Sequence, residues 1–181
     1  LQLPAGPWYE PAAGEGAIIE AVNAVRSDVV WTASELREEC RPLLAPLVKT
    51  QICSFFDVAA PGAPDWKGLA AVMITNPPFR LAEQFIERAT KSSRQGVAVI
   101  VRAAFLEGQG RFERLFSKNP PSHVLQFTER VVMHKGRLAP EGSTATAYAW
   151  LVWMGVSHTR LRWIAPCRKR LERPSDYEVA A

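Results

Sequence analysis

Residues 69–79 read Leu-Ala-Ala-Val-Met-Ile-Thr-Asn-Pro-Pro-Phe, and this stretch says most about the fold. Residues 69–74 are a short apolar run of the kind that forms a buried strand. Residues 80–91 follow with Leu81, Phe85 and Ala89 at helical spacing, which predicts a helix. A polar amide, two rigid prolines and an aromatic ring are therefore expected at the carboxyl end of a strand, where open α/β sheets bind their ligands.

The four residues Asn76, Pro77, Pro78 and Phe79 resemble the catalytic motif of amino-methyltransferases that use S-adenosylmethionine, above all the DNA adenine-N6 enzymes. The resemblance implies that the side-chain carbonyl of Asn76 and the backbone carbonyl of Pro77 accept the two N–H bonds of the target amine. Such an amine is a poor nucleophile because its lone pair is delocalised into the ring, and two fixed acceptors favour a pyramidal nitrogen. Proline keeps the acceptors rigid, and Phe79 can stack on an extruded base. A turn that merely ends a strand is the alternative for these four residues alone.

A second motif lies near the start of the chain, where residues 8–19 read Trp-Tyr-Glu-Pro-Ala-Ala-Gly-Glu-Gly-Ala-Ile-Ile. It resembles the cofactor loop of the same family, between the first strand and a first helix expected over residues 17–26. Glycines permit positive φ and close approach of a ligand, and a helix start suits a carboxylate. A Gly-x-Gly loop is weak evidence alone, and the order of the two motifs strengthens it.

Two acids complete the expected cofactor site. Residues 29–35 look like a second strand ending in Glu35, and residues 52–57 like a third strand ending in Asp57. The resemblance implies that Glu35 bonds the ribose hydroxyls and that Asp57 accepts from the adenine amino group, with Glu38 and Glu39 as weaker choices for the ribose. The residues expected to contact the cofactor are Glu10, Pro11, Ala12, Gly14, Gly16, Glu35, Asp57 and Asn76.

Charge separates the two halves of the chain. Residues 1–90 hold 7 Lys and Arg against 11 Asp and Glu, a balance of −4, and residues 91–181 hold 15 against 7, a balance of +8. A basic half favours a nucleic-acid backbone, and Trp163 among arginines suits stacking, although a solvated basic tail has the same composition. We expect DNA contacts from Arg111, Arg114, Arg160, Arg162, Arg168, Lys169 and Arg170.

Length and composition agree with one globular domain. The chain has 181 residues and 48% hydrophobic residues, and its apolar runs are too short to span a bilayer. Three scattered cysteines and three histidines without ligand spacing predict reduced thiols, no metal site and a cytoplasmic protein. We expect residues 1–181 to form a single methyltransferase domain with no separate target-recognition domain.

The remaining pattern completes the fold. Residues 96–101 read as a central parallel strand, residues 111–118 as a short helix, and residues 124–133 and 144–154 as two strands. The prediction is an α/β fold: a class I methyltransferase (Rossmann-like) domain with a doubly wound, mostly parallel sheet, closed by an antiparallel hairpin. A second Asn-Pro-Pro triplet, at residues 119–121, follows a helix and lacks an aromatic partner, so we read it as a helix stop and turn.

The sequence therefore predicts an enzyme that transfers a methyl group from S-adenosylmethionine to the N6 amine of adenine in DNA. Three alternatives stay open at this point: methylation of an RNA base, methylation of a protein glutamine, and a non-catalytic subunit of the same fold that only binds nucleic acid.

Overall fold

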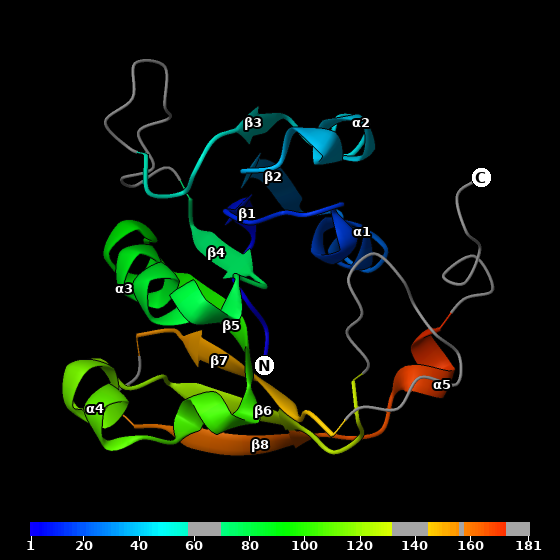
Figure 1. Ribbon diagram of the computed structural model, residues 1–181. Coiled ribbons are helices and arrows are strands. Elements are labelled where there is room, and N and C mark those ends of the chain that lie inside the picture. Colours follow the sequence, from blue (N-terminus) through cyan, green and yellow to red (C-terminus); the bar gives the residue numbers. More distant parts are fainter. Residues whose placement is uncertain (58–69, 132–144, 156–157, 173–181) are drawn as a thin grey trace.

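The computed structural model describes residues 1–57, 70–131, 145–155 and 158–172. Their strands form one eight-stranded sheet in the order β3-β2-β1-β4-β5-β7-β6-β8 (Figure 1). The strands are β1 (Gly6–Glu10), β2 (Val29–Glu35), β3 (Thr50–Ile52), β4 (Val72–Thr75), β5 (Gly96–Arg102), β6 (His123–Phe127), β7 (Tyr148–Trp153) and β8 (Arg160–Ile164). Only β7 runs antiparallel to its neighbours, β5 and β6. The predicted mostly parallel sheet is therefore confirmed.

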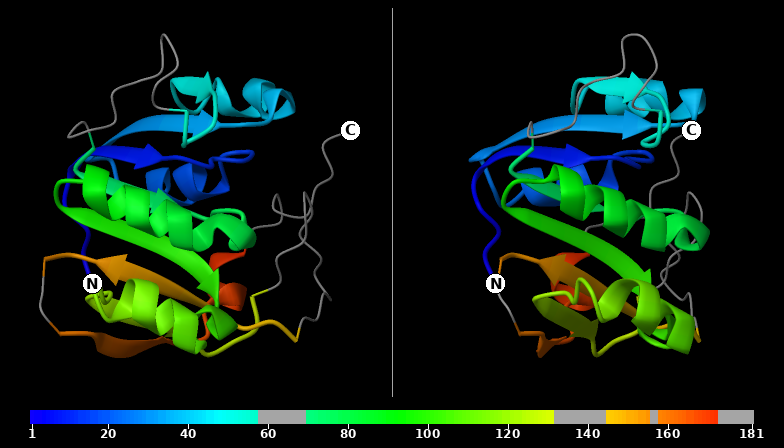
Figure 2. Two further views of the ribbon diagram at one scale, coloured as in Figure 1. Left: turned by 60° about the vertical axis from the view of Figure 1, so that its left-hand side comes forward. Right: turned by 90° about the vertical axis from the view of Figure 1, so that its left-hand side faces the viewer.

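Helices cover the two faces of the sheet (Figure 2). They are α1 (Ala17–Asn23), η1 (Glu38–Cys40), α2 (Arg41–Leu44), η2 (Phe79–Leu81), α3 (Ala82–Ser92), η3 (Ala103–Leu106), α4 (Gln109–Arg111), η4 (Phe112–Phe116) and α5 (Arg168–Leu171). One buried cluster joins Ile19 of α1 and Leu44 of α2 to Trp8 and Val72. A second cluster joins the α3 side chains to the opposite face of the sheet. Two cores on one sheet define a doubly wound domain.

The strongest sequence patterns fold as predicted. β2 occupies residues 29–35 and β5 covers the apolar run, while η2 and α3 replace the helix expected over residues 80–91. β7 is buried along nearly its whole length, as its continuous apolar pattern indicates. Together β6 and β7 form the expected antiparallel pair, although residues 132–144 between them lie outside the described residues.

The third strand lies earlier than predicted. β3 covers Thr50–Ile52, and residues 53–57 form a turn in which the Asp57 backbone N–H donates to the Ser54 carbonyl at 3.1 Å. The reason is tertiary packing. Phe55 is 2% exposed and stacks against Phe85 of α3, with ring centroids 5.0 Å apart, so the chain leaves the sheet to bury this ring. Asp57 therefore follows a turn, not a strand end.

Two elements were not predicted. Residues 160–164, read as part of a basic run, form the edge strand β8 parallel to β6, and α5 follows it. Conversely, β6 ends at Phe127, because the Glu129 carboxylate turns to accept the backbone N–H groups of Cys167 and Arg168 at the start of α5. No helix in the described part of the chain is long and apolar enough to cross a membrane.

Candidate active site

The glycine loop lies between β1 and α1, as predicted. Gly14 and Gly16 adopt φ values of +56° and +93°, which favour glycine. A Cβ on Gly16 would also lie 2.5 Å from Leu47 Cδ1, so a side chain there would force Leu47 to shift. The Gly16 N–H donates to the Ala13 carbonyl at 2.9 Å, and the Ala13 N–H donates to Ser34 of β2 at 3.0 Å. These bonds hold the loop as a tight cradle at the carboxyl edge of the sheet.

Glu35 anchors this cradle from the end of β2. Its Oε2 accepts the Gly14 backbone N–H at 2.7 Å, and its Oε1 accepts the Arg37 backbone N–H at 3.0 Å and Arg37 Nε at 3.1 Å. The Glu35 side chain is 8% exposed. The structure thus brings Glu35 and Gly14 together, as the predicted cofactor site requires. Oε1 already accepts two hydrogen bonds, but Oε2 accepts only one, so its second lone pair can accept a ligand hydroxyl.

Glu10, the last residue of β1, is 1% exposed, and its Oε2 has no hydrogen-bond partner among the described residues. Burial raises the pKa of Glu10 well above its usual range, and the neighbouring Glu35 charge raises it further. A buried carboxyl group with a vacant oxygen is costly unless something pairs with it. This residue is therefore suited to a positively charged ligand group arriving at the glycine loop.

A hydroxyl network supports the loop from below. The Tyr9 hydroxyl lies 2.6 Å from Ser34 Oγ, which donates to the Pro11 carbonyl at 3.1 Å. Burial raises the pKa of Tyr9 far above its ordinary value, so the phenol stays neutral and can serve as a donor. The network fixes Pro11, and with it the position of Glu10.

The Asn-Pro-Pro-Phe motif follows β4, which pairs with β1 inside the sheet. Thr75 is 1% exposed, and its Oγ1 has no hydrogen-bond partner among the described residues. Asn76 is exposed, Pro77 is buried, and Phe79 is half-buried at the start of η2. Since β1 and β4 are adjacent and parallel, the motif and the glycine loop meet at the same edge.

Two residues of this edge escaped the sequence analysis. Arg102 ends β5 and pairs in register with Tyr148, which begins β7. The Arg102 guanidinium carbon lies 4.7 Å from the centroid of the Phe79 ring, and the Tyr148 ring lies 5.8 Å from it at 36°. Because β4 and β5 are parallel, Arg102 and Tyr148 lie at the same edge of the sheet as the motif. The only sequence signal was an arginine ending an apolar strand, which is not specific.

The predicted adenine ligand, Asp57, is exposed and directly precedes residues outside the described part of the chain. Its proposed contact with the adenine of a cofactor stays a prediction.

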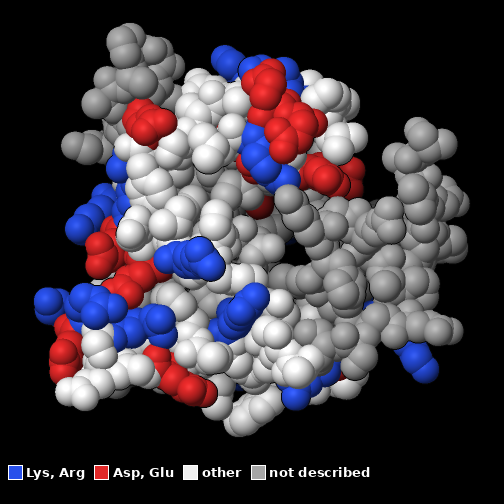
Figure 3. Space-filling model, in the orientation of Figure 1, with Lys and Arg blue, Asp and Glu red and all other residues white. Residues whose placement is uncertain are grey.

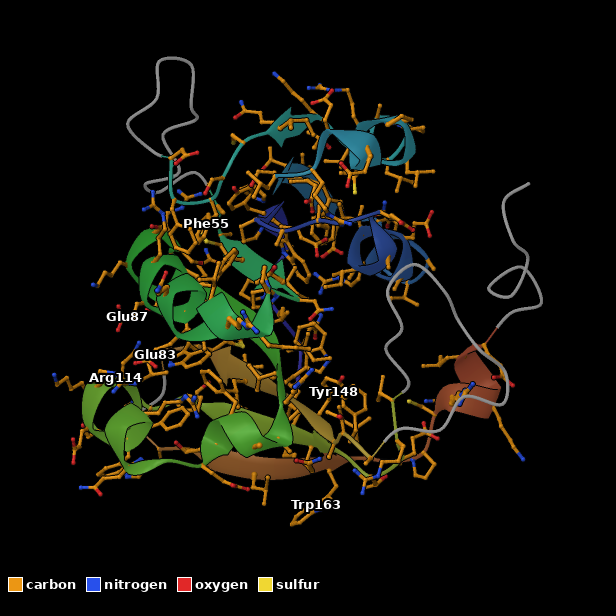
Figure 4. The ribbon with its side chains drawn as sticks, viewed as in Figure 1. Phe55, Glu83, Glu87, Arg114, Tyr148 and Trp163 are labelled. Atoms are coloured by element: carbon orange, nitrogen blue, oxygen red, sulfur yellow. The ribbon has the colours of Figure 1, made fainter. Side chains whose placement is uncertain are left out.

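The predicted nucleic-acid residues divide into two groups. Arg114 donates to both carboxylate oxygens of Glu83 on α3, at 2.7 and 3.0 Å, and Figure 4 shows the two side chains facing each other. Arg111 donates to the carbonyls of Phe105 and Glu107 and lies over the Phe105 ring. On this face basic side chains lie against acidic ones over α4, at the lower left of Figure 3. The donors of Arg111 and Arg114 are largely engaged within the fold, so a DNA role for them stays only a prediction.

The second group lies on β8 and α5. Because side chains alternate along a strand, Arg160 and Arg162 project from one face of β8 and Trp163 from the other. Trp163 therefore does not share a face of β8 with the two arginines, and its stacking on a base stays a prediction. Trp163 is 67% exposed and points away from the body of the protein (Figure 4). Arg168, Lys169 and Arg170 form α5, which follows the carboxyl end of β8.

This arrangement puts α5 on the side of the sheet that carries the motif. β8 is parallel to β6, and β6 is parallel to β5, since both pair antiparallel with β7. In the left view of Figure 2, α5 lies on the side to which the β5 arrow points. At about 4.8 Å between neighbouring strands, β8 lies about 19 Å from β4 along the edge.

The second Asn-Pro-Pro triplet lies at the opposite edge. Asn119 Nδ2 donates to Thr90 Oγ1 at 3.2 Å, and the Asn119 carbonyl accepts Trp153 Nε1 at 3.1 Å. Asn119 and Pro120 line a pocket of about 280 Å³ between the end of α3 and the start of β5. None of its lining residues belongs to the glycine loop or to the first triplet. Glu10, the glycine loop and the first triplet lie instead at the carboxyl edge, and the second triplet follows the turn that ends η4.

No family model matches the sequence, and no curated protein is similar to it. Solved structures do resemble the fold. A predicted O-methyltransferase from Agrobacterium tumefaciens is 17% identical with a TM-score of 0.58, over 91% of this chain and 81% of that one. The amino-terminal domain of human METTL16, in complex with SAH, is 13% identical with a TM-score of 0.50, over 85% and 63%. Its catalytic domain, in complex with a 3′UTR hairpin, is 10% identical with a TM-score of 0.50, over 88% and 67%. The protein has the class I methyltransferase fold, as predicted.

Proposed function

We propose that this protein transfers a methyl group from S-adenosylmethionine to the N6 amine of adenine in DNA. One observation carries the proposal: the Asn-Pro-Pro-Phe motif and the glycine loop end adjacent parallel strands, β4 and β1, at one edge of the sheet. Ligands of such sheets bind outside the carboxyl ends of the strands. The fold supports the same reading, because it is shared with methyltransferases.

The residues present fit the proposed cofactor. When bound, it supplies a methyl group on a positively charged sulfur, which an amine can take by direct displacement. Gly14 and Gly16 allow the cofactor to approach the loop backbone closely, and Glu35 Oε2 can accept a hydrogen bond from a ribose hydroxyl. The vacant oxygen of Glu10 is a partner for a cationic group, which supports binding of a ligand that carries an ammonium group and a sulfonium. Asp57 is the proposed partner of its adenine.

The motif prepares the target amine. Asn76 and the carbonyl of Pro77 accept the two N–H bonds, which directs the nitrogen lone pair outward. These bonds strengthen as the nitrogen becomes pyramidal and gains charge, so they act mainly on the transition state. Phe79 stacks on the base, which has to leave the helix first at a cost of a few kcal/mol. Holding the amine and the methyl group in reacting geometry contributes the remaining rate acceleration.

A nucleic-acid substrate is supported by the charge of the second half of the chain and by the position of α5 on the side of the motif. About 19 Å of sheet edge between β4 and β8 corresponds to some five or six base-pair steps of a DNA strand. RNA is the second candidate, favoured by the structural likeness to human METTL16, whose catalytic domain was solved with a 3′UTR hairpin.

The experiment that tests this proposal uses the parent protein with labelled S-adenosylmethionine and three substrates: unmethylated DNA, RNA of the same sequence, and total protein. Hydrolysis and nucleoside analysis then identify the product. Labelled N6-methyl-deoxyadenosine is expected. Label found only in RNA, or only in glutamine, would mean that this molecule and not DNA is the substrate. Binding of the cofactor without any product would favour the non-catalytic subunit.

A further inference from the structure

Arg102 occupies a position beside the motif that the reaction described above does not yet use. It is the last residue of β5 and lies opposite Tyr148, the first residue of the neighbouring strand β7. Its guanidinium lies over the ring of Phe79, 4.7 Å from the centroid. The ring proposed to receive the target base is therefore partly covered by a cation in the structure as it stands.

The charge of Arg102 is available. The side chain is exposed, and among the described residues no carboxylate forms an ion pair with it. By contrast, Arg111 and Arg114 are both held by Glu83 or by backbone carbonyls. A guanidinium that lies over an aromatic ring forms no conventional hydrogen bond with it, so its N–H groups can still donate to an arriving acceptor.

We propose that Arg102 is a substrate-positioning residue: its guanidinium binds the backbone phosphate next to the target nucleotide while Phe79 holds the base. This inference rests on the proposed function and names the part of the substrate that the site recognises. The planar fork of arginine matches two phosphate oxygens, and such charge-assisted bonds are stronger than an exposed cation–π contact. The guanidinium can therefore leave the ring when a phosphate arrives.

This exchange couples two events. Movement of Arg102 to the phosphate uncovers the face of Phe79 on which the base stacks. A free base, or a glutamine side chain in a peptide, lacks the phosphate and leaves the arginine on the ring. The site would thus favour a nucleotide within a chain over an isolated planar amide or amine.

The test pairs a protein change with a substrate change. The probe is a short DNA duplex around an adenine that the parent methylates, either unmodified or with one neutral methylphosphonate beside that adenine. Arg102→Gln should lower kcat/KM on the unmodified duplex about 10-fold or more and reduce the salt slope of binding by about 1. On the methylphosphonate duplex the variant and the parent should be nearly equal. Arg102→Lys, which keeps the charge without the fork, should recover part of the loss.

Arg94→Gln is the matched control, because Arg94 is also exposed and precedes the same strand at the opposite edge. It should respond to the methylphosphonate as the parent does. If Arg102→Gln lowered kcat/KM equally on the unmodified and the methylphosphonate duplex, the two effects would be additive. That result would overturn the role of Arg102 while leaving the proposed function intact. A parent protein that methylates no DNA would reject the proposed function, and the role of Arg102 on DNA with it.

Discussion

The backbone N–H of Gly14 donates a 2.7 Å hydrogen bond to Oε2 of Glu35, which ties the loop after β1 to the end of β2. The other oxygen of Glu35 is held by Arg37. One buried carboxylate therefore shapes the glycine loop from a neighbouring strand. Its removal should affect both the fold of the loop and the binding of any ligand there.

Glu35→Ala is expected to weaken binding of S-adenosylmethionine by about 1–3 kcal/mol and to lower the melting temperature, because it leaves buried donors without an acceptor. Calorimetric titration and thermal unfolding measure the two effects. Glu38→Ala is the control, since Glu38 is exposed and pairs with Arg41. Equal loss of affinity in both variants would mean that the ribose acid has been misassigned.

Glu10 should make stability depend on pH. Burial and the Glu35 charge raise the pKa of Glu10 well above its ordinary 4.5, so the folded protein holds a proton that the unfolded chain has lost. The contribution of the neutral Glu10 to stability is therefore fully present below pH 4.5 and is lost as the pH rises through the raised pKa. Glu10→Gln stays neutral, so its melting temperature should fall less than that of the parent between about pH 5 and pH 8.

Proton release on cofactor binding tests the same residue in a second way. If a cationic cofactor group pairs with Glu10, the parent should release a proton on binding, and Glu10→Gln should not. Calorimetry in two buffers of different ionisation enthalpy reports that proton. Identical proton release in both proteins would remove Glu10 from the cofactor site.

The basic residues of α5 should contact the nucleic-acid backbone. Neutralising Arg168, Lys169 and Arg170 together should flatten the log–log salt dependence of DNA binding by roughly 2–3 units. Arg114→Gln serves as the control and should leave the slope unchanged, because Arg114 is bound to Glu83. A slope that changes only in Arg114→Gln would place the DNA on η4 instead.

Much of this fold could be predicted because its central strands are continuous apolar runs. β4 and β5 follow such runs directly; the Asn-Pro-Pro-Phe motif sits at the end of β4 and the glycine loop at the end of β1. The prediction was wrong where distant packing overrides local pattern. Phe55 leaves the expected third strand to meet Phe85, and β8 exists because its backbone pairs with β6 although its side chains are exposed.

The site was predictable in part for a similar reason. A motif such as Asn76–Phe79 carries its chemistry in adjacent residues, whereas Arg102 and Tyr148 reach Phe79 only through the sheet. Within the described part of the chain, the lack of a hydrogen-bond partner for Glu10 Oε2 is likewise visible only in the folded structure, and no local pattern reports it.

The most direct measurement of the central claim compares Asn76→Ala with Asn119→Ala in both methyl transfer and cofactor binding. Asn76→Ala should lose at least about 100-fold in kcat with nearly unchanged affinity for S-adenosylmethionine, because its amide acts mainly in the transition state. Asn119→Ala should methylate DNA as the parent does and lose only about 1 kcal/mol of stability, through its bond to Thr90. An active Asn76→Ala beside an inactive, folded Asn119→Ala would contradict the account, since the active site would then lie at the opposite edge of the sheet.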